Sequence, residues 1–422
     1  MNQLAISKPS WNAEEGYSII RLPGGITRVA VVLVPKGRGS FEEQAEEVFG
    51  ALKRILEEQI PPAIPTITTV FLADEGNREA YQRLCANFFG RDFTVTTYVY
   101  QPPCCGAELA IEAWAVSGDT VRVSRQGPNL MTVAYNGLRW VYCGGVLPTT
   151  ASTGVYDQSL NAFGEMAQLL AKWGVDFDNV VRTWLYLGDI VGDVGPKQRY
   201  KELNRGRTDF FQGIRFGQAL LMPGVERGAY PASTGIGMGG KGLAMSCMAL
   251  LTRRPDVFLL PLENPGQTPA YEYGAGYSPQ SPKFSRAMAV ILGNYFTVWV
   301  SGTASIVDSE TRYIGDAAKQ TDQTIDNIER LIAEDNFLQH GVPGTGATLA
   351  DLSKIRVYVK RPEDYAACRD VCERRFGNIP AVYAVADVCR PDLLVEIEGV
   401  AFAKRHVTSP PEPVELRQEV HC

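Results

Sequence analysis

Histidine is scarce in this sequence, which has only three among 422 residues, at positions 340, 406 and 421. Mechanisms that pair a serine or cysteine with histidine, and zinc sites of the HExxH type, are therefore excluded as leading hypotheses. Acid–base chemistry must fall to carboxylates, tyrosines or cysteines. The chain has no run of five basic residues and a net charge of −6, so we expect no nucleic acid partner.

Long apolar segments are also missing. No stretch approaches the roughly 18 consecutive apolar residues of a membrane-spanning helix, and MNQLAISKPSWNAEEG lacks the basic start and apolar core of a signal peptide. We therefore expect no membrane partner and a cytoplasmic location. Nine cysteines are scattered without a pair of CxxC units, which favours free thiols and predicts no metal site.

A weak internal repeat organises the chain. A unit of strand, long helix, strand, second helix and strand can be traced three times. In its third copy we expect strands at 298–306, 352–360 and 393–403, and helices at 315–336 and 364–377. In every copy a tyrosine opens and a phenylalanine closes the second helix, at Tyr81, Tyr200 and Tyr365 and at Phe89, Phe211 and Phe376.

The repeat predicts an α+β fold made of three related lobes, each with a sheet packed against helices. We place the first lobe at 1–118, the second at 119–262 and the third at 263–408, followed by a tail at 409–422. In the first lobe, Ser40 and Glu43 have the spacing of a capping box at the start of the long helix.

The segment LLVEIEG, residues 393–399, alternates two glutamates with aliphatic residues. Because side chains along a strand alternate between its two faces, Glu396 and Glu398 point to the same side. An apolar setting and a neighbouring carboxylate both favour the protonated form, so Glu396 is the candidate acid. Glu398, which we also include among the candidate substrate-binding residues, is either a neighbour that tunes it or a structural partner of an arginine or a backbone amide. The first lobe has Ala110 at the matching position and the matching second-lobe strand has no carboxylate, so one active cleft is expected.

The repeated unit resembles the reactive intermediate deaminase family, also called YjgF or L-PSP. Its small α+β subunits form trimers with active sites in the clefts between subunits. The resemblance implies that three chorismate-mutase-like lobes form a pseudo-trimer within one chain, and we expect a monomer or a weak homo-oligomer.

A sharper resemblance covers residues 180–405 and rests on eight ordered segments. They are RTWLYLGDI, YPASTGIGMGG, ENPG, YSPQSPKFSRA, VSGTASIV, GDAAKQT, IRVYVKRPED and DVCRPDLLVEIEG. Together with the spacing from Tyr200 through Asn204 to Arg207, they are similar to the chorismatases, which split chorismate into pyruvate and a ring product. The resemblance implies a lyase without cofactor or metal that acts on a small dicarboxylate, and it places the family's general acid at Glu396.

Two carboxylates on a substrate call for guanidinium groups, which bind them through paired hydrogen bonds. The resemblance puts family arginines at Arg286 and Arg207, with Arg390 as a third candidate; an arginine at any of these positions can instead pair with an acidic side chain. Tyr273 and Tyr277 match two family tyrosines and are candidates for binding a carboxylate or hydroxyl, with a core aromatic role as the alternative.

Two positions separate branches of the chorismatases. The branch that hydrolyses chorismate to a dihydrodiol has alanine at both, whereas the branch that makes 3-hydroxybenzoate has glycine and cysteine, as Gly302 and Cys389 do here. Glycine makes room at the ring, and Thr303 beside it is placed among the substrate-binding residues. Cys389 either assists rearrangement, excludes water or is an inert buried thiol. The resemblance therefore implies conversion of chorismate to 3-hydroxybenzoate and pyruvate.

Two other functions stay open. A YjgF-type deaminase, which hydrolyses reactive enamines or imines, holds the substrate carboxylate with an arginine in a PxR pattern before the last strand; here IPAVYAV has Val382 at that place. A non-catalytic metabolite-binding pseudo-trimer, in which the glutamate serves packing, is the second alternative.

Overall fold

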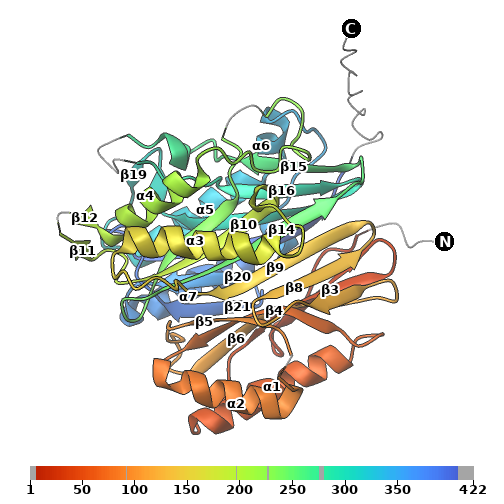
Figure 1. Cartoon of the computed structure of the whole chain (residues 1–422), viewed down its shortest axis with the longest axis vertical. Helices are drawn as coiled ribbons and strands as arrows, with labels where there is room; N and C mark the ends of the chain where they lie inside the picture. Colours follow the sequence, from red (N-terminus) through yellow and green to blue (C-terminus); the bar gives the residue numbers. More distant parts are fainter. Residues whose placement is uncertain (1–5, 92, 196, 226–227, 275–279, 407–422) are drawn as a thin grey trace.

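The computed structural model describes residues 6–91, 93–195, 197–225, 228–274 and 280–406. These residues form three six-stranded sheets, two short two-stranded ribbons and seven α-helices, so the fold is mixed α+β, as predicted (Figure 1). The predicted tail at 409–422 and the candidate Tyr277 lie outside the described residues. Among the described helices, none is long and apolar enough to cross a membrane.

The first sheet is covered on one face by two helices, α1 (Phe41–Glu57) and α2 (Arg78–Phe89), which lie together in Figure 1. The capping box predicted for α1 is present, with Ser40 and Glu43 each accepting a hydrogen bond from the other's backbone N–H. In spatial order the strands are β1 (Ser10–Asn12), β2 (Tyr17–Leu22), β3 (Ile26–Leu33), β6 (Leu109–Ser117), β4 (Ile64–Leu72) and β5 (Val95–Val99).

The second sheet packs against α3 (Val155–Ala171) and α4 (Arg199–Phe211), which share a buried apolar cluster with its strands. In spatial order the strands are β7 (Arg122–Arg125), β8 (Leu130–Tyr135), β9 (Leu138–Val146), β14 (Leu243–Thr252), β10 (Val180–Gly188) and β13 (Ala232–Met238). A small ribbon of β11 (Asp193–Val194) and β12 (Lys197–Gln198) precedes α4.

The third sheet packs against α5 (Ala317–Ile332), α6 (Glu334–Gln339) and α7 (Tyr365–Phe376). In spatial order the strands are β15 (Val257–Leu262), β16 (Ala287–Leu292), β17 (Tyr295–Ala304), β22 (Val395–Lys404), β20 (Leu352–Val359) and β21 (Ala381–Val385). A second ribbon joins β18 (Ile306–Val307) to β19 (Glu310–Thr311).

All three sheets repeat one connectivity. Numbered within each lobe, the strands lie in the order 1-2-3-6-4-5, and strands 4 and 5 form a parallel pair. Strands 4 and 6 share a register shift in every lobe, at Pro65/Ile67, Val180/Arg182 and Leu352/Lys354. Counting along the strands from this shift matches Glu396 of β22 with Ala110 of β6 and Ala244 of β14.

The sheet faces that carry no helices pack against one another. One buried apolar cluster contains residues of all three sheets, among them Trp114 of β6, Met248 of β14 and Phe402 of β22. Burial of this apolar surface is the main favourable contribution to holding the three sheets together. Side chains on these inner faces therefore lie at contacts between lobes, and this is the side to which Glu396 and Glu398 point.

Candidate active site

A pocket opens between the second and third sheets. Its walls come from α4 and β13 of the second lobe, and from the segment before β16, from β17 and from the segment leading into β22 of the third lobe. The space that no protein atom fills is about 770 Å³, including the open mouth. The residues that line it include Tyr200, Asn204, Arg207, Ser233, Tyr273, Phe284, Arg286, Gly302, Cys389, Arg390 and Glu396.

Helix α4 presents three polar side chains to the pocket. Tyr200, Asn204 and Arg207 are spaced four and three residues apart, which places them on one face of the helix. Arg207 is buried; its Nη2 donates to Oδ1 of Asn204 and its Nη1 donates to Oγ of Ser233 at 3.3 Å. Burial lowers the pKa of Arg207 from its ordinary value, yet a guanidinium stays charged at any physiological pH.

A second buried guanidinium faces the same pocket from the third lobe. Arg286 lies directly before β16, and its Nη2 donates to the hydroxyl of Tyr273 at 2.5 Å and to the carbonyl of Thr268 at 3.1 Å. Both guanidinium groups lie near the ring of Phe284, with each guanidinium carbon 5.5 Å from its centroid. The structure thus brings the predicted Arg207 and Arg286 together from two lobes.

The two arginines have donor capacity left over. Within the described part of the chain, no group accepts a hydrogen bond from Nε of Arg207, Nε of Arg286 or Nδ2 of Asn204. Buried donors without a partner are rare in folded proteins. An anion bound in the pocket would supply the missing acceptors.

Glu396 lies on β22 and is 4% exposed. Among the described residues, none donates a hydrogen bond to its carboxyl or forms an ion pair with it. Burial raises its pKa to about 8; the nearby Glu398 adds to the shift, and Arg182 and Arg286 oppose it. The pocket therefore contains a carboxyl group that holds its proton at neutral pH and is able to donate it.

Glu398 has the opposite environment. Its Oε2 accepts from Nη2 of Arg182 at 2.7 Å and from the hydroxyl of Thr234. Its Oε1 accepts from the indole N–H of Trp184 at 3.0 Å and lies 3.2 Å from Nη1 of Arg356. Glu398 does not line the pocket. Its contacts are those of a structural partner of arginines, and its charge also raises the pKa of Glu396.

Gly302 of β17 stands directly against the catalytic candidate. A Cβ at this position would overlap Oε1 of Glu396 and lie 2.8 Å from its Cδ. Thr303 was predicted to contact substrate, but the alternation of a strand turns it to the opposite face, where its hydroxyl donates to the carbonyl of Ser301 at 2.9 Å. Thr303 is not part of the pocket wall.

Cys389, Tyr273 and Arg390 all line the pocket. Burial raises the pKa of the Cys389 thiol to about 12, and the charge of Glu396 adds to the shift, so this thiol is neutral. The Arg390 guanidinium lies 5.3 Å from the Tyr273 ring centroid, and its Nη1 donates to the carbonyl of Ser309 at 2.8 Å.

The prediction did not include Tyr200, Asn204, Ser233 and Phe284 among the site residues. The helical spacing of Tyr200, Asn204 and Arg207 carried a usable signal, since it predicts one face. No such signal exists for Ser233, because only the packing of two lobes brings β13 against β17.

A deaminase-type arginine that served this pocket would have to stand at a different position from Val382. IPAVYAV forms β21, which packs near the first lobe through the bridge between Pro103 and Ala384. Strand β13 lines the pocket instead, and its register matches Val382 with Thr234. Neither position has an arginine.

Two family models match the chain. The one described as "Chorismatase FkbO/Hyg5-like, N-terminal" matches residues 112–249, and the one described as "Endoribonuclease L-PSP" matches residues 279–403. Apart from the last residues of β6, from 112 on, both matches fall on the two lobes that build the pocket.

Curated relatives and a solved structure are similar over most of the chain. A 3-hydroxybenzoate synthase of Streptomyces hygroscopicus is 36% identical over 303 residues, which are 70% of this chain and 82% of that protein. A chorismatase of the same organism is 32% identical over 271 residues, which are 63% of this chain and 74% of that protein. A chorismatase crystal structure has a TM-score of 0.64 at 22% identity and covers 89% of this chain and 98% of its own; this last similarity concerns the fold.

Proposed function

The chain belongs to the chorismatase family, and from this premise we propose that it converts chorismate to 3-hydroxybenzoate and pyruvate. The observation that carries the proposal is Glu396, a buried carboxyl with a pKa of about 8 in a pocket with two buried arginines. Chorismate is a dicarboxylate with an enol ether, so the charges of the pocket and of the substrate are complementary.

Arg286 and Arg207 bind the substrate carboxylates. Each is held in place by hydrogen bonds to protein acceptors, and each has an Nε donor with no acceptor among the described residues. Paired hydrogen bonds from a fixed guanidinium orient a carboxylate as well as attract it. The ring of Phe284, which lies near both arginines, packs against the apolar part of the substrate.

Glu396 delivers its proton to the methylene carbon of the enol ether, which becomes the methyl group of pyruvate. The bond between the ring carbon and the ether oxygen then breaks, and pyruvate leaves with that oxygen. The ring hydroxyl on the next carbon closes onto the carbon that pyruvate leaves, forming an epoxide, and returns its proton to Glu396. The epoxide then opens at its other C–O bond: its oxygen takes up a proton and the carbon that still carries the oxygen loses one, which leaves an aromatic ring with its hydroxyl at position 3. The two products together contain the atoms of chorismate, so no water is consumed.

Gly302 and Cys389 set the outcome at the ring. Gly302 leaves the space in which the Glu396 carboxyl lies. The neutral Cys389 thiol occupies the pocket wall beside it and keeps water away from the ring, which favours the aromatic product over a hydrolytic dihydrodiol.

The three lobes form a pseudo-trimer in this proposal. The shared strand order and the apolar cluster drawn from all three sheets support it. Only the contact between the second and third lobes is catalytic, because the positions that match Glu396 are Ala110 and Ala244.

The proposal is tested by incubating the purified chain with chorismate and measuring pyruvate and ring products by chromatography. Equal amounts of 3-hydroxybenzoate and pyruvate are expected, and Glu396→Gln should abolish both. Glu363→Gln, which removes an exposed glutamate, is the matched control and should leave the rate unchanged. Hydrolysis of a reactive imine without chorismate turnover would establish the deaminase alternative, and chorismate binding without turnover would establish the non-catalytic one.

A further inference from the structure

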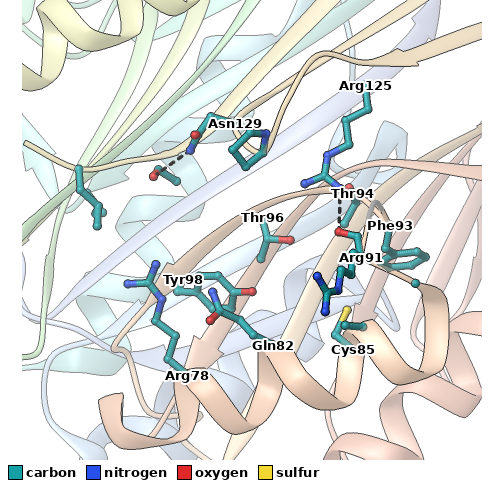
Figure 2. A pocket seen from close by; sticks show the side chains of 16 residues that line it. Arg78, Gln82, Cys85, Arg91, Phe93, Thr94, Thr96, Tyr98, Arg125 and Asn129 are labelled. Carbon is teal, nitrogen blue, oxygen red and sulfur yellow. Dashed lines mark hydrogen bonds between the residues drawn. The ribbon is translucent and has the colours of Figure 1, made fainter.

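A second pocket lies between the first and second lobes, away from Glu396 (Figure 2). Its walls come from α2 and β5 of the first lobe and, in the second lobe, from the β7–β8 connection, β9 and β14. The space that no protein atom fills is about 1030 Å³, including the mouth. It is therefore at least as large as the catalytic pocket.

This second pocket is built from the same structural parts as the catalytic one. The strand registers match Thr96 and Tyr98 of β5 with Ser233 and Gly235 of β13, and all four line their respective pockets. They also match Gly145 with Gly302, since β9 and β17 have the same register shift at this point.

The helices follow the same correspondence. Both α2 and α4 end in a pair of phenylalanines, and aligning these pairs matches Gln82 with Asn204 and Cys85 with Arg207. The matched residues line the two pockets. The second pocket is therefore the counterpart of the catalytic pocket at another lobe contact.

Two replacements remove the catalytic chemistry from this counterpart. Ala244 lines it at the position that matches Glu396, so no proton donor stands there. Leu147, a larger side chain, takes the place that matches Ala304 in the catalytic pocket. A ligand bound here would not be turned over by the mechanism proposed for Glu396.

The charge of the second pocket nevertheless favours anions. Three arginines line it, and its described lining contains no aspartate or glutamate. In Figure 2, Arg78 lies at one end beside Tyr98, and Arg91 and Arg125 lie at the other. The Arg78 guanidinium is 4.9 Å from the Tyr98 ring centroid, and Nη1 of Arg125 donates to the carbonyl of Arg91 at 3.0 Å. The three arginines stand at positions that do not correspond to those of Arg207 and Arg286 in the catalytic pocket.

Aromatic side chains supply the remaining recognition surface. Tyr98 and Phe93 line the pocket, Tyr98 beside Arg78 and Phe93 beside Arg91 in Figure 2, and flat rings pack against such side chains. We propose that this pocket is a second, non-catalytic binding site for a small ring carboxylate of the benzoate type. The proposal rests on the pocket's own lining and does not depend on the reaction at Glu396.

Equilibrium dialysis of the full chain with 3-hydroxybenzoate tests the proposal by counting sites. Two sites per chain are expected, and Arg286→Gln, which impairs the catalytic pocket, should leave one. In the Arg286→Gln background, the double change Arg78→Gln and Arg91→Gln should weaken the remaining site at least tenfold. Arg83→Gln removes the same charge from α2 at an exposed residue outside the lining and should have no effect.

Other outcomes separate this proposal from the proposed function. A single site that Arg286→Gln abolishes would overturn the second site and leave the catalytic pocket intact. A single site that only the Arg78 and Arg91 changes abolish would support the second site and count against the catalytic pocket as the binder. Equal losses with Arg83→Gln, or displacement of the ligand by equimolar inorganic phosphate, would also overturn the proposal. A Leu147→Trp variant, which fills the pocket and keeps every arginine, should lose the site as well.

Discussion

Replacing Glu396 with glutamine should stabilise the fold, and the gain should grow with pH. The pKa of Glu396 is raised from 4.5 to about 8, first by burial and then by Glu398, whereas an unfolded chain has an ordinary carboxyl. Between these two values the native state binds a proton that the unfolded state has released, so stability falls as pH rises. Below about pH 4.5 both states are protonated, and above about pH 8 the loss is complete.

The size of the effect follows from the two pKa values. Each pH unit within the window is worth about 1.4 kcal/mol, so the full span of about 3.5 units gives roughly 5 kcal/mol. Glutamine does not titrate and escapes this loss. The Glu396→Gln variant should therefore gain little at pH 5, about 3 kcal/mol at pH 7 and about 5 kcal/mol at pH 9, relative to its difference at low pH.

Urea unfolding followed by tryptophan fluorescence measures this gain. The midpoints of the native chain and the variant should separate as pH rises, with equal slopes that indicate unchanged exposure on unfolding. Glu363→Gln, at an exposed site, should show no such separation. A midpoint difference that is the same at pH 5 and pH 9 would refute the reasoning, because it would mean that Glu396 is already ionised in the native state at pH 5.

Four further changes test the neighbouring residues. Glu398→Gln leaves buried arginines short of a carboxylate and should cost about 3–5 kcal/mol, measured by urea unfolding; a loss under about 1 kcal/mol would contradict its structural role. Arg286→Gln should lower kcat/KM for chorismate about 100-fold or more, and unchanged kinetics would remove it from the site. Gly302→Ala displaces the Glu396 carboxyl and should lower kcat about 100-fold with a smaller change in KM. A wild-type kcat would contradict the position of the carboxyl against Gly302. Cys389→Ala should raise the share of dihydrodiol in the products, and an unchanged product ratio on chromatography would make the thiol inert.

Local patterns predicted the inner elements of the third lobe well. The expected helix at 364–377 corresponds to α7, and the expected strands at 352–360 and 393–403 correspond to β20 and β22. The expected helix at 315–336 ends earlier, because Ala333 has an extended backbone that separates α5 from α6. Amphipathic periodicity extends across such a break, so it does not reveal it.

The outer strands of each sheet were missed. In the third lobe, β16 is a short and wholly apolar run, and β21 is a five-residue strand that alternates between buried and half-buried positions. A short run of this kind has too little periodicity to separate strand from loop or helix. One of the missed strands, β13, packs against β17 of the third lobe, so one wall of the pocket was missed with it.

Glu396 and Glu398 also show what a local sequence pattern does and does not predict. Alternation placed both on one face, and the apolar partners Val395 and Ile397 are indeed in the core. The sequence did not decide what Glu398 contacts, because its partner Arg182 belongs to β10 of another lobe. Contacts between lobes depend on how the three sheets pack, and no local pattern contains that information.

The origin of the new hydrogen in pyruvate tests the central claim most directly. The reaction with chorismate is run in D₂O, and pyruvate is trapped at once by enzymatic reduction to lactate and weighed by mass spectrometry. Protonation of the methylene carbon by Glu396, whose proton exchanges with solvent, predicts one deuterium in the methyl group and no product from Glu396→Gln. Pyruvate with an unlabelled methyl group, or full activity in Glu396→Gln, would contradict the assignment of Glu396 as the proton donor.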